Sequence, residues 1–326
     1  MTRQTRSNDP PAKPPSAPGR VVPDELSGRP LDGVVRALFG VSWGDARAHI
    51  ASGKITVDGG VRLEERAKIR AGSVVELKMN APRPRKESLG AEGVVFVDAH
   101  VVVVNKPAGV STVPFDEGEK GTLDERVRDW LAHNAPRGGG APRPPLGVVH
   151  RLDKETSGLI VFTRTWLAKK SLSSQFRAHT TLRRYVAIAH GKVTSRTIRS
   201  RLMADRGDGL RGSYRSEARD AEQGQLAITH VEALEDLKGG ATLIACKLET
   251  GRTHQIRIHL SEAGHPIVGE RVYVRRFDGP LVAAPRLMLH AEELGFEHPS
   301  TGEKVRWEQP PPADFEEALA RLRRGG

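Results

Sequence analysis

The sequence predicts an α+β protein of two domains. Strand-like runs follow one another with helices interspersed, and the chain lacks the regular strand–helix repeat of a doubly wound sheet. The stretch APRPRKESLGAEG has a linker composition and separates a short front part from a long second part. With 326 residues, the chain is long enough for two hydrophobic cores, one of them large.

The front part reads as a tail followed by a compact unit of two helices and a small sheet. Residues 1–20 are rich in Pro, Ser and Arg, so we expect a disordered basic tail and order from near Val21. RPLDGVVRALFG carries an apolar stripe at helical spacing, and GDARAHIASGK predicts a second short helix. KITVDGGVR indicates a strand with an Asp-Gly turn, and SVVELKM a closing strand. The unit therefore spans residues 21–80, followed by a linker over residues 81–92.

The second domain is predicted over residues 93–316. VVFVD and VVVVN are strand-like runs joined by two residues, and LRRYVAIAHG, ITHVEAL and TLIACKLET add further strands. WLAKKSLSSQFRAH and PADFEEALARLRR have helical patterns. Residues 135–145 are rich in Gly and Pro and indicate a flexible loop. Residues 317–326 are taken as a C-terminal tail.

The net charge of +11 is concentrated in the front part of the chain. Residues 1–86 hold 16 Lys and Arg against 9 Asp and Glu, whereas residues 87–326 hold 35 against 31. A basic front unit suggests a polyanionic partner, and nucleic acid fits best because no apolar run approaches the length of a membrane span. The single cysteine, Cys246, excludes an internal disulfide and a cysteine-rich metal site, which suits the cytoplasm.

The stretch HRLDKETSGLIVF, residues 150–162, places five ionisable side chains directly before a strand that reads as buried. They are His150, Arg151, Asp153, Lys154 and Glu155. Such a cluster is either an ordinary solvated turn or a set of functional groups held by a rigid scaffold.

Two further stretches place polar groups on regular elements. In LRRYVAIAHG, strand alternation places Tyr185 on one face with small alanines beside it. In TGRTHQIRIHLSEAGHP, helical spacing places His254, Arg257 and Ser261 on the side opposite the apolar residues. A core tyrosine with a bonded hydroxyl is the alternative reading of the first stretch.

The same residues argue against several chemistries. Two histidines of the helical stretch, His254 and His259, are five apart and cannot readily chelate one ion, so we expect no metal site. The chain has no Walker A sequence and no kinase GxGxxG or DFG motif. A two-metal nuclease needs clustered carboxylates, whereas Asp153 stands nearly alone among basic side chains. This combination favours a lone carboxylate that an arginine holds ionised and that acts without a metal.

Ordered motifs over roughly residues 93–316 resemble the RluA-type family of RNA pseudouridine synthases. The most specific is HRLDKETSGLIVFTRT, followed by SSQFRAHTTLRRYVAIAHG and LETGRTHQIRIHLSEAGHPIVGERVY. VVVVNKPAGVST upstream and RLMLHAEELGFEHPSTGEKVRWEQPPPADF downstream fit the same family in the same order. The resemblance implies a mixed, largely antiparallel central sheet with flanking helices and loops. The front unit is similar to the small S-four RNA-binding domain, although the usual basic residues at the start of its second helix are replaced around Trp43.

The resemblance implies roles for three residues in isomerising uridine to pseudouridine. Asp153 matches the essential catalytic aspartate, which either attacks as a nucleophile or abstracts a ribose proton. Arg257 matches the basic residue that pairs with this aspartate. Tyr185 matches the tyrosine that stacks on the target base and helps to remove the proton from its carbon 5. A base treated in this way must leave its helical stack.

The resemblance also implies how RNA is held. Arg151 matches the arginine that fills the gap left by the flipped nucleotide, and Lys106, Arg252 and His254 are further expected RNA contacts. We expect no cofactor and no metal. We also expect the protein to be a monomer in the cytoplasm. Large-subunit ribosomal RNA is the leading substrate, with transfer RNA possible. The alternatives are a non-catalytic RNA-binding or ribosome-assembly factor of the same fold and, with less support, a phosphotransferase.

Overall fold

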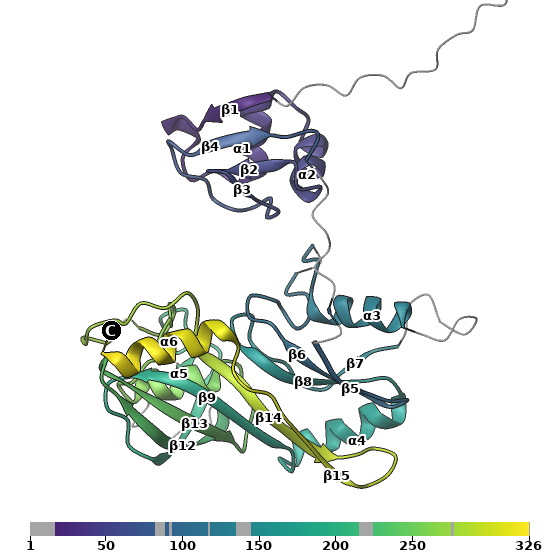
Figure 1. Ribbon diagram of the computed structural model, residues 1–326, viewed down its shortest axis with the longest axis vertical. Coiled ribbons are helices and arrows are strands. Elements are labelled where there is room, and N and C mark those ends of the chain that lie inside the picture. Colours follow the sequence, from purple (N-terminus) through teal and green to yellow (C-terminus); the bar gives the residue numbers. More distant parts are fainter. Residues whose placement is uncertain are drawn as a thin grey trace, which may run out of the picture. The chain divides into compact units, whose positions relative to one another are not determined.

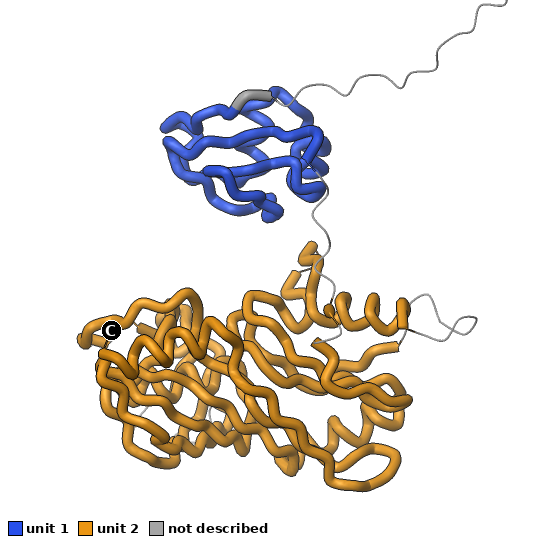
Figure 2. The backbone as a smooth tube through the Cα atoms, in the orientation of Figure 1, with its two compact units in different colours: residues 1–86 blue, residues 87–326 orange. Residues whose placement is uncertain are grey.

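The chain forms two compact units, residues 1–86 and residues 87–326, each with its own sheet and core (Figure 2). A computed structural model describes residues 17–81, 89–90, 93–116, 118–134, 145–214, 224–274 and 277–325. Most of the expected N-terminal tail, linker and Gly-Pro-rich loop therefore lie outside the described residues. In the described part of the chain, no helix has the length and apolar character needed to cross a membrane.

Unit 1 is a four-stranded antiparallel sheet with two α-helices (Figure 1). Its elements are β1 (Ala17–Val21), a 3-10 helix (Asp24–Leu26), α1 (Leu31–Phe39), α2 (Trp43–Ala51), β2 (Ile55–Val57), β3 (Gly60–Val61) and β4 (Val74–Leu77). The strand order is β1-β4-β2-β3. Both predicted helices and the hairpin are confirmed. Order begins earlier than predicted, because β1 starts at Ala17 and pairs with β4.

The core of unit 1 follows from the apolar stripe of α1. Leu31, Val34 and Val35 are fully buried and belong to one cluster with Ile55 and Val75 of the sheet. Helix α1 ends at Gly40, which has a left-handed backbone conformation that glycine adopts without the steric strain of a side chain.

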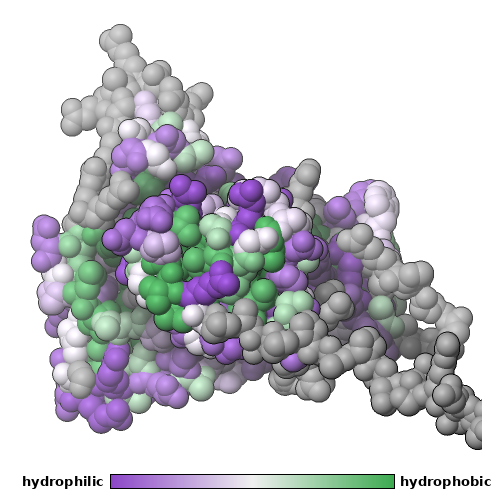
Figure 3. Space-filling view, turned by 90° about the horizontal axis from the view of Figure 1, so that it is seen from above, coloured by the Kyte–Doolittle hydropathy of each residue, from purple (hydrophilic) through white to green (hydrophobic). Residues whose placement is uncertain are grey.

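The hairpin between β2 and β3 turns at Asp58 and Gly59. Both residues have positive φ, 51° and 80°, as a two-residue turn of an Asp-Gly pair requires. Val21, Val61 and Leu63 of the same unit are each at least half exposed. Seen from above, the molecule shows hydrophobic residues gathered among hydrophilic ones (Figure 3). The surface therefore presents apolar side chains to solvent next to hydrophilic ones.

Unit 2 is built on one large, mostly antiparallel sheet (Figure 1). Its strands are β5 (Val94–Val97), β6 (Val101–Lys106), β7 (Gly147–Val148), β8 (Ser157–Thr163), β9 (Leu182–His190), β10 (Arg196–Met203), β11 (Gly212–Ser213), β12 (Gln225–Leu237), β13 (Ala241–Leu248), β14 (Leu289–Glu297) and β15 (Lys304–Glu308). Its helices are α3 (Leu123–His133), α4 (Trp166–Arg177), α5 (Gln255–Glu262) and α6 (Ala313–Arg324). The described strands run in the order β11-β10-β12-β13-β9-β14-β8-β6-β5, with β15 on β14 and β7 on β8. Only the pairing of β14 with β8 is parallel among these. The predicted α+β class, with its mixed and largely antiparallel sheet, is confirmed.

Helices cover both faces of the sheet around β6, which explains the run of four valines. Val102 and Val104 share a core cluster with residues of α3, whereas Val101 and Val103 share another with Ala168 of α4. Side chains alternate between the faces of a strand, so a strand buried on both sides is apolar throughout.

The end of the chain belongs to this core. Helix α6 runs to Arg324, and its residues Phe315, Ala318, Leu319 and Leu322 are buried in the main cluster. Residues 317–326 are therefore not the expected tail, because the apolar stripe of PADFEEALARLRR continues past residue 316 at helical spacing.

Candidate active site

A cavity of about 330 Å³ opens in unit 2 where three segments meet. They are the turn before β8 (residues 149–156), the end of α4 with the start of β9 (residues 176–185), and the passage from β13 into α5 (residues 248–257). The volume is that of a small-molecule pocket. Asp153, Tyr185 and Arg257, singled out from the sequence, all line it.

Asp153 lies in a turn whose backbone is fixed from two sides. The hydroxyl of Thr112 donates to the carbonyl of Leu152 at 2.8 Å and accepts from its N–H at 3.1 Å. The ammonium of Lys106 donates to the carbonyl of Lys154 at 2.9 Å. The carboxylate between these anchors is 18% exposed, so it reaches the cavity from a rigid support.

The histidine that opens this turn has a structural role. The His150 ring stacks on Phe176 with centroids 4.4 Å apart, and its Nε2 accepts a hydrogen bond from the N–H of Val161 at 3.1 Å. Burial, with the nearby charge of Arg183, lowers the pKa of His150 to about 3, so the ring is neutral. The ring connects the turn to β8, and the charges of the turn come from Arg151, Asp153, Lys154 and Glu155.

Arg257 joins two carboxylates. Its Nε and Nη2 donate to Glu270 at 2.7 and 2.8 Å, while Nη1 lies 3.6 Å from Oδ2 of Asp153. The side chain of Glu270 is fully buried. Burial alone would lower the pKa of Arg257, but the hydrogen bonds and charge of Glu270, together with Asp153, raise it. The family resemblance implied a pair of Arg257 with the aspartate; here the planar fork is held by Glu270 and one nitrogen remains for Asp153.

Helix α5 is buried all round, and this differs from the amphipathic pattern expected. Six of its eight residues, Gln255 to Leu260, are buried, including Arg257 and His259. Gln255 bonds Thr250 and Thr229, and His259 bonds Thr229 and Ser200, so these polar side chains are satisfied inside the unit. Gln255 and His259 lie on a different side of the helix from His254, Arg257 and Ser261, so α5 has polar side chains on more than one buried side.

His254 caps this helix in a left-handed conformation, with φ of 59°. Its Nδ1 lies 2.7 Å from the hydroxyl of Tyr273 and its Nε2 lies 3.9 Å from Oδ1 of Asp153. Burial lowers the pKa of His254 against the opposing pull of Asp153, which favours a neutral ring at neutral pH. His179, which also lines the cavity, has φ of 58°. Backbone strain of this kind collects at functional sites.

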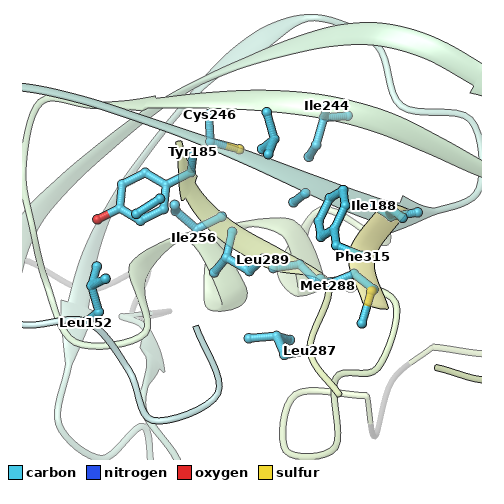
Figure 4. Packing of buried hydrophobic residues seen from close by; sticks show 14 of the residues in the cluster. Leu152, Tyr185, Ile188, Ile244, Cys246, Ile256, Leu287, Met288, Leu289 and Phe315 are labelled. Atoms are coloured by element: carbon cyan, nitrogen blue, oxygen red, sulfur yellow. The ribbon is translucent and has the colours of Figure 1, made fainter. Parts of the chain in front are cut away.

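Tyr185 stands on β9 at the edge of the main hydrophobic cluster. Figure 4 shows its ring near Ile256 and Leu152, with the hydroxyl pointing away from the core. The residue is 8% exposed, and burial raises the pKa of its phenol to about 12. The hydroxyl is therefore protonated at neutral pH, and the ring offers a flat apolar surface to the cavity.

The family model for RNA pseudouridylate synthase matches residues 100–262, a range that contains Asp153, Tyr185 and Arg257. A relative from Pseudomonas aeruginosa, named ribosomal large subunit pseudouridine synthase D, is 37% identical over 93% of this chain and 94% of its own length. The chain belongs to the RNA pseudouridine synthase family. A protein of the same name from Nitrosomonas europaea is 33% identical over 93% of this chain and 87% of its own length.

Solved structures agree with this pseudouridine synthase in fold. Human RNA pseudouridylate synthase domain containing 4 superposes with a TM-score of 0.57 at 23% identity, covering 71% of this chain and 93% of the human one. The likeness at this identity concerns the fold. The RluA-type resemblance and the enzyme class predicted from the sequence are confirmed by the family match and the relatives.

Arginines dominate the wall of the pseudouridine synthase cavity. Those that line it are Arg151, Arg177, Arg183, Arg252 and Arg257, and Asp153 is the one carboxylate among the described lining residues. Arg151 is exposed, and Arg252 donates through Nε to the carbonyl of Leu226 at 3.0 Å. Arg183 donates through Nη2 to the carbonyl of Glu249 at 2.8 Å, but its buried Nε has no partner in the described part of the chain. The cavity is thus suited to an anionic ligand.

Lys106 does not fit the expected role of an RNA contact. It is fully buried, and its ammonium donates to the carbonyls of Pro107, Val110 and Lys154. Burial lowers its pKa to about 7 despite the opposing charges of Asp153 and Glu155. No donor remains for a phosphate, because these three carbonyls, two after β6 and one in the turn before β8, take all three protons of the ammonium.

Two residues of the site were not predicted from the sequence. Glu270 holds the fork of Arg257, and Tyr273 bonds His254. Both follow α5 in the stretch HPIVGERVY, where a single acid among apolar residues was the available signal. The described residues contain no group of three His, Cys, Asp or Glu that could hold a metal ion.

Proposed function

We propose that this RNA pseudouridine synthase isomerises uridine in large-subunit ribosomal RNA, with Asp153 as the catalytic residue. The observation that carries the proposal is the placement of Asp153 beside Arg257, at 3.6 Å, in the cavity that Tyr185 also lines. The relatives named ribosomal large subunit pseudouridine synthase D support the choice of RNA, because they match nearly the whole chain.

The reaction detaches uracil from the ribose, turns it and rejoins it through carbon 5. The target nucleotide must leave its stack to reach a cavity of this kind, at a cost of a few kcal/mol. Asp153 serves either as a nucleophile or as the base that takes a ribose proton, and both roles use an ionised carboxylate. The guanidinium of Arg257, with Nη1 at 3.6 Å from Oδ2, orients this carboxylate.

Tyr185 positions the base by stacking in the pocket. Its phenol is protonated at neutral pH, since burial raises its pKa to about 12. A part in removing the carbon 5 proton therefore requires that the phenol pass its own proton to a neighbour. Asp153, whose charge acts on Tyr185, is the acceptor that the cavity offers.

Unit 1 would then supply a second surface for the same RNA. Trp43 opens α2 and is 47% exposed, with the guanidinium carbons of Arg36 and Arg47 at 5.1 and 5.9 Å from its ring. Where the S-four pattern has basic residues at the helix start, this chain has an aromatic ring with arginines from both helices. Because Arg47 is also paired with Asp32 and Glu65, the positive charge that this cluster offers to RNA comes mainly from the exposed Arg36.

The test is to map pseudouridines in the RNA of a strain that lacks this protein and of strains that express the wild type or Asp153→Asn. We expect one or more large-subunit sites to lose pseudouridine without the protein and to regain it only with the wild type. If pseudouridine were lost from transfer RNA alone, transfer RNA would be the substrate instead of ribosomal RNA. We further propose that the protein acts as a monomer in the cytoplasm.

A further inference from the structure

Four side chains follow one side of α4, the helix labelled in Figure 1, as the helical spacing of the sequence places them. Trp166, Lys170, Ser173 and Arg177 follow one another at steps of four, three and four residues, so they lie on one side of the helix. Ala168 and Leu172 are buried on the opposite side. At the helical rise, the stripe is about 16 Å long.

One end of this stripe opens into the catalytic cavity. Arg177, with the neighbouring Phe176 and His179, lines the cavity. At the other end, Trp166 is 74% exposed and Leu167 is 51% exposed. The stripe is therefore a surface continuous with the cavity, ending in an uncovered aromatic ring.

The charge of this segment has one sign. Residues 156–204 contain ten Lys and Arg and no Asp or Glu. The ammonium of Lys170 lies 5.4 Å from the ring centroid of Trp166, which leaves the rest of this exposed ring free to stack. Glu297 of β14 contacts α4 through its backbone, which hydrogen-bonds the side chain of Gln175. Gln175 lies half a helical turn away from the stripe. No acidic side chain of α4 itself opposes an anion here.

We infer that the α4 stripe binds the RNA strand that flanks the target uridine, with Trp166 as a stacking platform for one base. Lys170 and Arg177 would neutralise phosphates between that base and the cavity. A stacking ring combined with cations, on a helix without acidic residues, is the kind of surface that single-stranded nucleic acid prefers. Sixteen ångströms accommodates about five nucleotides at the ~3.4 Å spacing of stacked bases. The inference rests on the proposed function, since the cavity supplies the point where the strand begins.

The experiment measures binding of the full-length protein to a fluorescent RNA fragment in which the wild type forms pseudouridine. Trp166→Ala should weaken binding about tenfold at constant salt, as expected for one lost stacked base, and Trp166→Phe should restore most of it. Lys170→Gln should reduce the dependence of log Kd on log salt by about 0.7, the share of one phosphate contact on a single strand.

Matched controls remove the same kinds of side chain elsewhere on unit 2. Leu281→Ala deletes another exposed apolar side chain and Lys238→Gln another exposed cation, and neither should change affinity or salt slope. Unchanged binding in Trp166→Ala and an unchanged slope in Lys170→Gln would overturn the inference, as would equal losses in the controls. A short oligouridine strand serves as a second probe. If the wild type modified no ribosomal fragment, the proposed substrate would fail, whereas binding of this strand would still report on the stripe.

Discussion

Replacing Glu270 by Gln should destabilise unit 2 far more than its position away from the cavity wall suggests. The carboxylate receives two hydrogen bonds from Arg257, at 2.7 and 2.8 Å, and backbone N–H groups of Arg271 and Val272 at 3.0 and 2.9 Å. Its side chain is fully buried and that of Arg257 is 10% exposed. Removing one partner of such a pair leaves an uncompensated buried charge, which costs about 3 kcal/mol or more.

The chain offers a matched control on its surface. Arg323 donates to Glu235 through the same fork, with Nε at 3.0 Å and Nη2 at 2.7 Å, but both side chains are well exposed, at 47% and 39%. Glu235→Gln should therefore change the free energy of unfolding far less than Glu270→Gln does, because solvent screens an exposed ion pair. Urea denaturation of both variants and the wild type at pH 7, followed by circular dichroism, gives the comparison. Equal losses in the two variants would refute the reasoning.

The difference should also depend on pH. Burial alone would raise the pKa of Glu270, but the hydrogen bonds and charge of Arg257, with the N–H groups of Val272 and Tyr273, lower it below 4.5. A group whose pKa is lowered by folding adds stability above its unfolded value and loses it as pH falls through its folded value. The gap between the wild type and Glu270→Gln should therefore be full at pH 7 and narrow below about pH 4.

Three further predictions concern turnover and RNA binding. Tyr185→Phe keeps the stacking ring and should lower turnover at least tenfold with little change in RNA affinity; equal turnover would show that the hydroxyl takes no part. A protein that starts near residue 88 should still form pseudouridine, while its salt slope falls by about 2 to 3 units if unit 1 makes three phosphate contacts. A second truncation starting at Val21 separates the share of the N-terminal segment, and an unchanged slope would contradict RNA binding by unit 1. EDTA should leave activity intact on an RNA folded without divalent ions, and a loss there would contradict a mechanism without a metal.

Periodicity in the sequence predicted most of the regular elements because their apolar residues follow a clear pattern, along one face of a helix or along both faces of a buried strand. The stripe of α1 and the run of four valines in β6 are examples, since both are buried as their spacing indicates. Helix α5 could not be read in this way. Its polar residues face hydrogen-bond partners on β10 and β12, strands remote in sequence, and composition alone does not distinguish that from solvent.

The site shows the same division. Asp153, Tyr185 and Arg257 were found through motifs, and the structure brings all three to one cavity. Glu270 and the burial of Lys106 depend on contacts that only the fold creates: a carboxylate thirteen residues from its arginine, and a lysine whose three acceptors come from two separate loops. A charged residue in a motif reads as a ligand contact until its own partners are known.

The most direct test of the central role of Asp153 is the release of tritium from carbon 5 of labelled uridine by the wild type and by Asp153→Asn. Asparagine keeps the shape of the side chain, so the turn anchored by Thr112 and Lys106 should persist and RNA affinity should stay close to that of the wild type. The amide is neither a nucleophile nor a base, and the variant should release no tritium above background over many wild-type turnovers. Sustained release by Asp153→Asn at more than a few per cent of the wild-type rate would contradict the assignment of the catalytic residue.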